Sequence, residues 1–326
     1  RSMGAVPPLT IGLPVYNGEQ YLARSVDAVL GQTFGDFELI LCSNASTDGT
    51  DEICHAYERE DERVRFIRQP RNIGAAPNHM FLVAEARAPL FKWASGDDLY
   101  ARTLLERCVD ALADAPEAVL AHSWTAAIDG DDNLIQALDY PLDTANPSPA
   151  RRLESMLYAG DEMPGAIRAD DFYGVFRTEV LNRARPHDSY FHADQTFMSQ
   201  FALEGPFAIV PEWLYFRRHH ADRALQANPT IRSWCANLDP RRAGGFNPAA
   251  RLVAEYLWDS MAVIGRSSLS GAEKRECYTV TARWFASRAA RRVRGAHRDD
   301  SGTPHAPVTH PPVDVAAVVA RRPDPA

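Results

Sequence analysis

Residues 10–42 read TIGLPVYNGEQYLARSVDAVLGQTFGDFELILC and have the pattern of one strand–helix–strand unit. Its two ends, Thr10–Val15 and Glu38–Cys42, are short apolar runs with β-branched residues, which is typical of buried strands. Between them, Glu19–Leu30 places its apolar residues on one helical face: Leu22, Val26, Val29 and Leu30. A helix between two buried strands favours a parallel pair, because parallel strands need a long crossover connection.

This alternation of strand and helix continues to about residue 220. Further strands are predicted at Val64–Ile67, Leu90–Ala94, Ala118–Ser123 and Phe207–Val210. Further helices are predicted at Gly49–Glu62, Asn78–Ala86 and Arg102–Ala115. The order predicts an α/β fold, Rossmann-like, with a mostly parallel sheet flanked by helices on both faces. In such sheets ligands bind beyond the carboxyl ends of the strands.

The rest of the chain has a different pattern. We interpret Asp139–Asp171 as a long loop over the site, with one short helical stretch near Arg152–Tyr158. After Leu225 the pattern is purely helical, with helices predicted at Thr230–Asn237, Pro248–Ile264 and Ala272–Arg294. We therefore expect three parts: an α/β domain over 4–224, a helical C-terminal extension over 225–297 and a disordered tail over 298–326.

Composition excludes some classes of protein. The 326 residues carry a formal net charge of -8, which argues against nucleic acid as a partner. The five cysteines are scattered without a C-x-x-C pair, as expected for reduced core thiols. No apolar run approaches the roughly 20 residues that span a bilayer, and no signal peptide is apparent. We expect a cytoplasmic protein, with peripheral attachment to a membrane left open.

One segment is the reason for leaving peripheral membrane attachment open. Arg283–Arg298 contains six arginines beside Trp284 and Phe285. It is interpreted either as a solvated terminal helix or as a surface helix that docks weakly on anionic lipid or on an acidic partner.

Polar residues follow the first three strands. Pro14 and Tyr16 end the first strand, where an aromatic ring could lie against a flat base, although this is also a good plain turn. Ser43 and Asn44 end the second strand and suit hydrogen bonds to the edge of a nucleobase. After the third strand come three residues that could approach a diphosphate, or decorate the surface: Arg71, Asn72 and Gly74.

The fourth strand ends in Asp97-Asp98. Two adjacent carboxylates repel each other unless a cation lies between them, and Mg²⁺ or Mn²⁺ prefers such oxygen ligands. The alternative is an N-cap of the following helix. Asp194 has the same alternative, because it opens an amphipathic helix, and His220 could be either a metal ligand or a surface residue.

Three familiar patterns are excluded. Asp129–Asn133 resembles a calcium loop, but Leu134 stands where that loop requires glycine, so we predict a hairpin turn. No G-x-G-x-x-G follows a strand, which leaves a dinucleotide cofactor unsupported. Neither a P-loop nor a G-x-S-x-G motif is present.

In chain order, the motifs resemble those of the family 2 glycosyltransferases, which have the GT-A fold. The matching stretches are LPVYNGEQYL, NASTDGT, RNIGAAPN, WASGDD, ADQTFMSQFALEG and PEWLYFRRHH, within about residues 8–222. Each motif is modest, but six in register are specific. The resemblance implies a metal-dependent, inverting transfer of a sugar from a nucleoside-diphosphate sugar, UDP- or dTDP-linked, to an acceptor hydroxyl.

The resemblance also implies roles for single residues. Pro14, Tyr16 and Ser43 would surround the base, and Arg71, Asn72 and Gly74 would pack against nucleotide and diphosphate. Asp98 would be the direct ligand of Mn²⁺ or Mg²⁺, with Asp97 facing ribose or sugar and His220 near the metal or diphosphate. Asp194 would be the catalytic base. The acceptor side would be lined by Gly174, Phe176 and Arg177.

Two residues depart from the family pattern. Ser43 replaces the usual aspartate that reads the base, which leaves the choice of nucleotide open, and Ala193 replaces a glutamate often found before the catalytic base. Two rival classes share the architecture: a nucleotidyltransferase, which would need a glycine-rich loop where Leu13–Tyr16 stands, and a non-catalytic nucleotide-sugar binding module. The acceptor could be a small molecule or a glycan.

Overall fold

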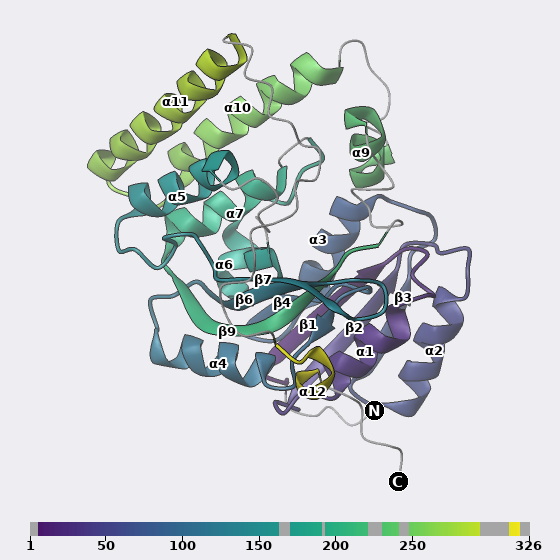
Figure 1. The fold of residues 1–326 in the computed structure, drawn as a ribbon. Helices are drawn as coiled ribbons and strands as arrows, with labels where there is room; N and C mark the ends of the chain where they lie inside the picture. The colour runs from purple at the N-terminus through teal and green to yellow at the C-terminus, as the bar shows by residue number, and fades with distance from the viewer. Residues whose placement is uncertain are drawn as a thin grey trace.

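The computed structural model describes residues 6–162, 170–190, 193–220, 230–240, 248–293 and 313–319 (Figure 1). The strands are β1 (Leu9–Val15), β2 (Phe37–Ser43), β3 (Val64–Arg68), β4 (Leu90–Trp93), β5 (Leu99–Tyr100), β6 (Leu120–Ile128), β7 (Leu134–Leu138), β8 (Val175–Arg177) and β9 (Phe207–Arg218). The first helices are α1 (Leu22–Leu30), α2 (Thr50–Glu60), α3 (Ala75–Glu85), α4 (Leu104–Asp114) and α5 (Pro149–Glu162). They are followed by the 3-10 helix η1 (Asp170–Tyr173), α6 (Thr178–Arg183), α7 (Ala193–Glu204), α9 (Ile231–Leu238), α10 (Pro248–Arg266), α11 (Gly271–Val293) and α12 (Val315–Val318).

One mixed sheet organises the fold. Its strand order is β3-β2-β1-β4-β8-β6-β9-β5, with β7 paired to β6. Strands β1 to β4 are mutually parallel, as predicted, whereas β8 is antiparallel to both of its neighbours. The chain first builds outward from β1 to β3 and then returns to place β4 on the other side of β1. The topological switch point therefore lies between β1 and β4.

Helices cover both faces of the sheet, which confirms the predicted α/β class. Alternate residues of β2 show why: Leu39 and Leu41 join the core under α1, α2 and α4, while Ile40 and Cys42 join the core under α3, α6 and α7. The strands thus read as nearly continuous apolar runs because both of their faces are buried.

The predicted loop over 139–171 contains a core helix instead. Helix α5 buries Leu153 and Leu157 in a cluster with residues of α7, α10 and α11, among them the fully buried Trp284. The short helical stretch predicted near Arg152–Tyr158 was too short, because this amphipathic helix gains its stability from the C-terminal helices. The helical extension therefore shares a core with the α/β domain.

The two aromatic residues of the Arg-rich segment are packed into the protein. Trp284 is buried and Phe285 is partly buried, while Arg288 lies over the Trp284 ring at 4.7 Å. These two rings pack inward, so they form no exposed apolar face for membrane docking. Beyond Val293 the segment lies outside the described residues.

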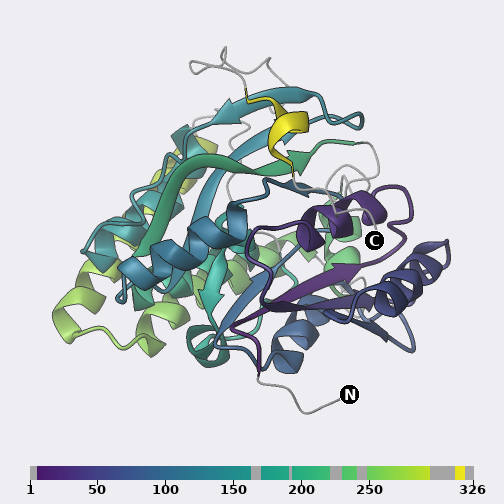
Figure 2. The same cartoon turned by 90° about the horizontal axis from the view of Figure 1, so that it is seen from below.

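Part of the tail expected to be disordered is ordered. Within 313–319, Val315 is buried in the main core and Val319 forms a β-bridge with Ala101. Asp314 caps α12 by accepting a hydrogen bond from the Ala317 N–H. Figures 1 and 2 both show this yellow helix beside the sheet. The apolar run of 313–319 explains the order, because it covers core residues between β5 and α4.

Two further expectations were tested. Cys42, Cys54, Cys108 and Cys277 are free and buried, as predicted, whereas the side chain of Cys235 lies outside the described residues. No helix in the described ranges is long and apolar enough to cross a bilayer.

Candidate active site

The first four strands bring their polar termini to one edge of the sheet. Because β1, β2, β3 and β4 are parallel, the residues after Val15, Ser43, Arg68 and Trp93 all emerge at that edge. The candidate residues of the three nucleotide motifs and the Asp97-Asp98 pair are therefore brought together, as the sequence predicts.

Tyr16 is the exposed element of this edge. It follows β1, and about half of its surface is exposed, at 48%. The next residue, Asn17, has a φ of +50° and accepts a hydrogen bond from the Thr47 N–H at 2.9 Å. This contact holds the turn after β1 against the loop after β2, so the Tyr16 ring lies on a fixed turn with a face open to a planar ligand. Pro14, in β1, is partly buried.

Ser43 and Asn44 are turned inward, unlike the prediction that they contact a base. The Ser43 hydroxyl donates to Ser46 Oγ at 3.1 Å and accepts from the Ser46 N–H at 3.2 Å. The Asn44 amide donates to Asn72 Oδ1 at 3.1 Å and accepts from the Ile73 N–H at 2.9 Å. Both side chains are almost fully buried, so they shape the loops that carry the site.

Gly74 lets the backbone of its loop come close to another part of the chain, the end of α9, and not to a ligand. Its φ is +93°, and a Cβ there would come within 2.4 Å of the Leu238 carbonyl oxygen and 2.9 Å of Asp239 Cα. The prediction of a ligand contact is replaced by a contact between the β3–α3 loop and the end of α9. Arg71 lies on the same loop, is exposed, and makes no ion pair within the described part of the chain.

Asp98 is a structural carboxylate. It is fully buried, Oδ2 accepts a hydrogen bond from the Tyr215 hydroxyl, and Oδ1 accepts from the Arg218 N–H at 2.8 Å. Its own carbonyl accepts from the Ser25 hydroxyl at 2.7 Å. Lys92 lies nearby in the core, and burial lowers its pKa to about 8, while Cys108 and Asp98 oppose that shift. Asp98 thus anchors β9 to the loop between β4 and β5, residues 94–98, which we call the strand-tip corner.

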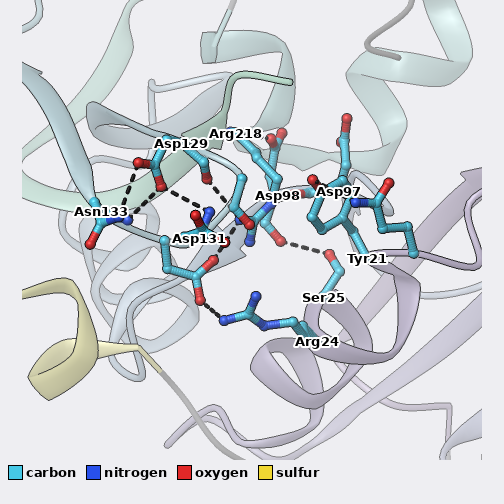
Figure 3. A network of polar contacts seen from close by, with 12 residues as sticks. Tyr21, Arg24, Ser25, Asp97, Asp98, Asp129, Asp131, Asn133 and Arg218 are labelled. Atoms are coloured by element: carbon cyan, nitrogen blue, oxygen red, sulfur yellow. Dashed lines mark hydrogen bonds and ion pairs between the residues drawn. The ribbon is translucent and has the colours of Figure 1, made fainter. Parts of the chain in front are cut away.

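Asp97 points the other way, toward the open edge (Figure 3). Its side chain is 25% exposed, and its Oδ2 lies 3.0 Å from Nε2 of His220. Its Oδ1 accepts a hydrogen bond from the Ser95 hydroxyl. Asp97, and not Asp98, is therefore the carboxylate that reaches the open edge, whereas the prediction gave the metal to Asp98 and the ribose or sugar to Asp97.

The Asp97–His220 pair fits a divalent cation. Asp97 Oδ2 and His220 Nε2 are joined by a direct hydrogen bond at 3.0 Å, and adjacent ligands of an octahedral ion with bonds of about 2.1 Å stand the same roughly 3.0 Å apart. His220 Nδ1 is buried and has no hydrogen-bond partner among the described residues. No cluster of three or more His, Cys, Asp or Glu occurs in the described ranges, so a ligand's oxygens and water would complete the shell.

Asp129–Asn133 forms the predicted hairpin turn between β6 and β7. Asp129 Oδ1 accepts hydrogen bonds from the N–H groups of Asp131 and Asn133, both at 2.9 Å, and Asp132 has a φ of +70°. Sequence reasoning did not find that this turn lies beside the Asp97-Asp98 corner, where Arg218 joins the two (Figure 3).

Asp194 lies in the first turn of α7 and is exposed. Burial lowers the pKa of His187, and the charge of Asp194 opposes that shift, so the two side chains lie close together. His187 contributes to the wall of a cavity of about 700 Å³. The other lining residues are Pro77, Met80, Arg185, Pro186, Asp188, Ser189, Asp239 and Arg251. Asp194 interacts electrostatically with His187, a wall residue of a cavity large enough for a small ligand, but is not itself among the described residues that line it.

The predicted acceptor-side residues are not at this cavity. Phe176 is fully buried in the core, and Arg177 donates to the carbonyls of Ala118 and Leu112 at 2.8 and 2.9 Å. Because β8 is antiparallel to β4, Arg177 lies beside Leu90, at the opposite edge of the sheet. Gly174 packs on β6, where a Cβ would meet the Ala121 carbonyl oxygen at 2.7 Å. This geometry assigns the three residues to the scaffold.

Curated proteins of known name are similar to this chain in sequence. The chondroitin synthase of Escherichia coli is 32% identical over 219 residues, which is 67% of this chain and 30% of that protein. The putative glycosyltransferase EpsE of Bacillus subtilis is 34% identical over 110 residues, or 33% of this chain and 39% of that one. The chain thus spans less than half the length of these curated relatives.

The fold is also found among solved structures. S. aureus TarS 1-349 in complex with UDP-GlcNAc superposes with a TM-score of 0.59 at 14% identity, covering 90% of this chain and 77% of that one. The family model described as "Glycosyl transferase family 2" matches residues 10–184, more than half of the chain. With its parallel half-sheet, its strand-tip carboxylates and this match, the chain belongs to glycosyl transferase family 2.

Proposed function

We propose that the protein transfers a sugar from a nucleoside-diphosphate sugar, UDP- or dTDP-linked, to an acceptor hydroxyl with inversion at C1, and that it needs Mn²⁺ or Mg²⁺. The observation that carries the proposal is the Asp97–His220 pair, a carboxylate and an imidazole 3.0 Å apart at the carboxyl edge of the sheet. The UDP-GlcNAc complex of TarS, which shares the fold, supports a UDP-linked donor.

Asp97 and His220 would hold the cation at the switch point next to the donor diphosphate. A bound divalent ion neutralises charge that develops on the leaving diphosphate. Tyr16 offers its exposed ring to the base, and the exposed Arg71 can pair with phosphate oxygens. Asn44 and Asn72 keep the loop of Arg71 in place through the hydrogen bond between their side chains.

Asp194 would accept the proton of the attacking hydroxyl. The neighbouring cavity is lined by charged, hydroxyl and imidazole groups together with proline and methionine, and no aromatic side chain other than His187 is among the described residues that line it. This lining favours a polar acceptor of carbohydrate size, in keeping with the glycan product in the name of the chondroitin synthase.

The test is release of nucleoside diphosphate from a panel of UDP- and dTDP-sugars, with and without saccharide acceptors. We expect release to depend on acceptor and on added Mn²⁺ or Mg²⁺, and to stop with EDTA. Formation of a nucleoside triphosphate and a sugar 1-phosphate when pyrophosphate is added would instead identify a nucleotidyltransferase, although Leu13–Tyr16 has no glycine-rich loop. Tight donor binding without turnover for any acceptor would identify a binding module.

Replacing Asp194 tests the base directly. Asp194→Asn is expected to keep donor affinity and to lower turnover by about 10²- to 10⁴-fold, because it removes the proton acceptor but no donor contact. Isothermal calorimetry of the donor and steady-state kinetics measure the two effects. Glu204→Gln, an exposed carboxylate at the other end of α7, is the matched control, and equal turnover losses in both variants would contradict a special role for Asp194.

A further inference from the structure

Arg218 is a buried cation that the proposed chemistry does not use. It ends β9, and its side chain is fully buried, with its NH1 2.5 Å from Asp132 Oδ1. Arginine is almost never buried to this extent unless it is paired. Burial lowers its pKa, and the nearby Tyr21 and Asp98 oppose that shift. Keeping such a charge in the interior needs a structural or functional reason.

The planar guanidinium joins two loops that are distant in sequence. Its Nε donates to the carbonyl oxygen of Asp97 at 2.7 Å, and its NH1 donates to the carbonyls of Asp129 and Gly130 at 2.9 and 3.1 Å. Figure 3 shows Arg218 between the strand-tip corner and the β6–β7 turn. A lysine ammonium could not reach both loops, because only a planar fork presents donors in two fixed directions.

Arg218 also contacts the ring of Tyr21, which packs against His220. Its Cζ lies 4.6 Å from the centroid of the Tyr21 ring, and that ring also packs against His220, at 4.9 Å between centroids. Asp132 links the arrangement to α1 through its ion pair with Arg24. One side chain therefore contacts both the backbone of Asp97 and the ring that packs on His220.

We propose that Arg218 is a positioning residue that holds Asp97 and His220 at the separation suited to a shared divalent cation, and that Asp132 of the β6–β7 turn supports it. The inference rests on the proposed metal-dependent function. It assigns to Arg218 no contact with the donor or acceptor.

The experiment measures binding of Mn²⁺ and of UDP by calorimetry on the full chain, with thermal unfolding as the check of folding. Arg218→Lys keeps the charge but loses the fork. Arg217→Lys is the matched control, because neighbouring strand residues point to opposite faces and Arg217 is partly exposed. Asp132→Asn is a second probe, because it removes the balancing charge without touching the Asp97–His220 pair.

We expect Arg218→Lys to weaken Mn²⁺ binding in the presence of UDP by about 10- to 100-fold, as for other groups that orient metal ligands. UDP binding in EDTA and all binding by Arg217→Lys should equal the wild type. Asp132→Asn should shift Mn²⁺ affinity in the same direction by a smaller factor. The double variant should be less than additive, since both act through one guanidinium.

Wild-type Mn²⁺ affinity in Arg218→Lys, with only a lower unfolding temperature, would overturn the positioning role while leaving the proposed function intact. If Arg218→Lys does not fold, Asp132→Asn decides in the same way. If the wild type shows no Mn²⁺-dependent UDP binding, the proposed metal site and the positioning role both fall.

Discussion

Asp97 and Asp98 are adjacent in the chain but have opposite surroundings. Asp98 points into the core, where Tyr215 and the Arg218 N–H occupy its two oxygens, and Asp97 points to the partly exposed edge beside His220. The bend at Gly96 and Asp97, between the end of β4 and the start of β5, turns the two side chains apart. The same acidic pair therefore contains one structural and one candidate functional carboxylate.

The two aspartates should respond differently to the same change. Asp97→Asn is expected to abolish metal-dependent UDP binding with little loss of stability, because its side chain is partly exposed. Asp98→Asn should lower the free energy of unfolding by about 2 kcal/mol or more, because a buried, charge-assisted pair of hydrogen bonds is lost. Urea unfolding and calorimetry with Mn²⁺ and UDP measure both. The reverse pattern would restore Asp98 as the metal ligand.

Ser43 and Asn44 show why residue roles are harder to predict than their location. Their position at the tip of β2 follows from the pattern of the strand. Their orientation depends on partners in other loops, Ser46 for one and Asn72 with Ile73 for the other. Short polar side chains can bind a ligand or close a turn equally well, and only the neighbouring backbone decides between the two.

At the scale of elements, the β3–α3 loop and the end of α9 depend on each other. Gly74 lies in a backbone region that only glycine adopts readily, and its carbonyl accepts hydrogen bonds from Asn44 Nδ2 and the Asn78 N–H, both at 3.2 Å. Because Asp239 follows α9 and lines the cavity, this contact connects the β3–α3 loop with the cavity wall.

Gly74→Ala is expected to lower the free energy of unfolding by about 1–3 kcal/mol, since the backbone is strained and the new Cβ meets the Leu238 carbonyl. Urea unfolding measures it. The control is Gly35→Ala, where the nearest atom to a new Cβ is 3.9 Å away and the change should be within about 0.5 kcal/mol. Equal effects at the two sites would contradict the close contact with α9.

Strand β9 is longer than its pattern predicts. The predicted strand ended at Val210, before Pro211, yet the pairing with β6 continues to Arg218. The register shifts between Ser123 and Thr125 accommodate the proline, which cannot donate a hydrogen bond. This extension carries Tyr215 and Arg218 to the Asp97-Asp98 corner, so the site depends on a strand pairing that is remote in sequence.

At the scale of the whole molecule, stability is tied to pH through buried histidines. His122 on β6 is 2% exposed, its ring lies 4.1 Å from that of Tyr140, and its Nε2 has no hydrogen-bond partner among the described residues. Burial lowers its pKa to about 4 from the usual 6.5, although the hydrogen bond to the Ser123 carbonyl opposes the shift. The ring is therefore neutral in the folded state at pH 5, while it is protonated in the unfolded state.

Since the unfolded state binds the proton first, stability is lost as pH falls from about 6.5 to about 4. For His122 alone we expect a loss of about 2 kcal/mol between pH 7 and pH 5. His122→Asn should reduce this pH dependence, although it also lowers stability at pH 7. Urea unfolding at the two pH values measures this dependence, and an unchanged slope in His122→Asn would exclude His122 as its source.

The alternation of strands and helices specified the α/β class and the parallel half-sheet, because local periodicity and turn residues encode these features. It also specified the edge of the sheet at which Tyr16, the loop of Asn44, the loop of Gly74 and Asp97 meet. Tertiary structure alone decided which aspartate faces the edge, that Arg177 lies at the opposite edge, and that α5 and Val315 belong to the core. Those outcomes arise from contacts between segments far apart in the chain, such as β6 with β9 and α5 with α11. No local pattern records such contacts.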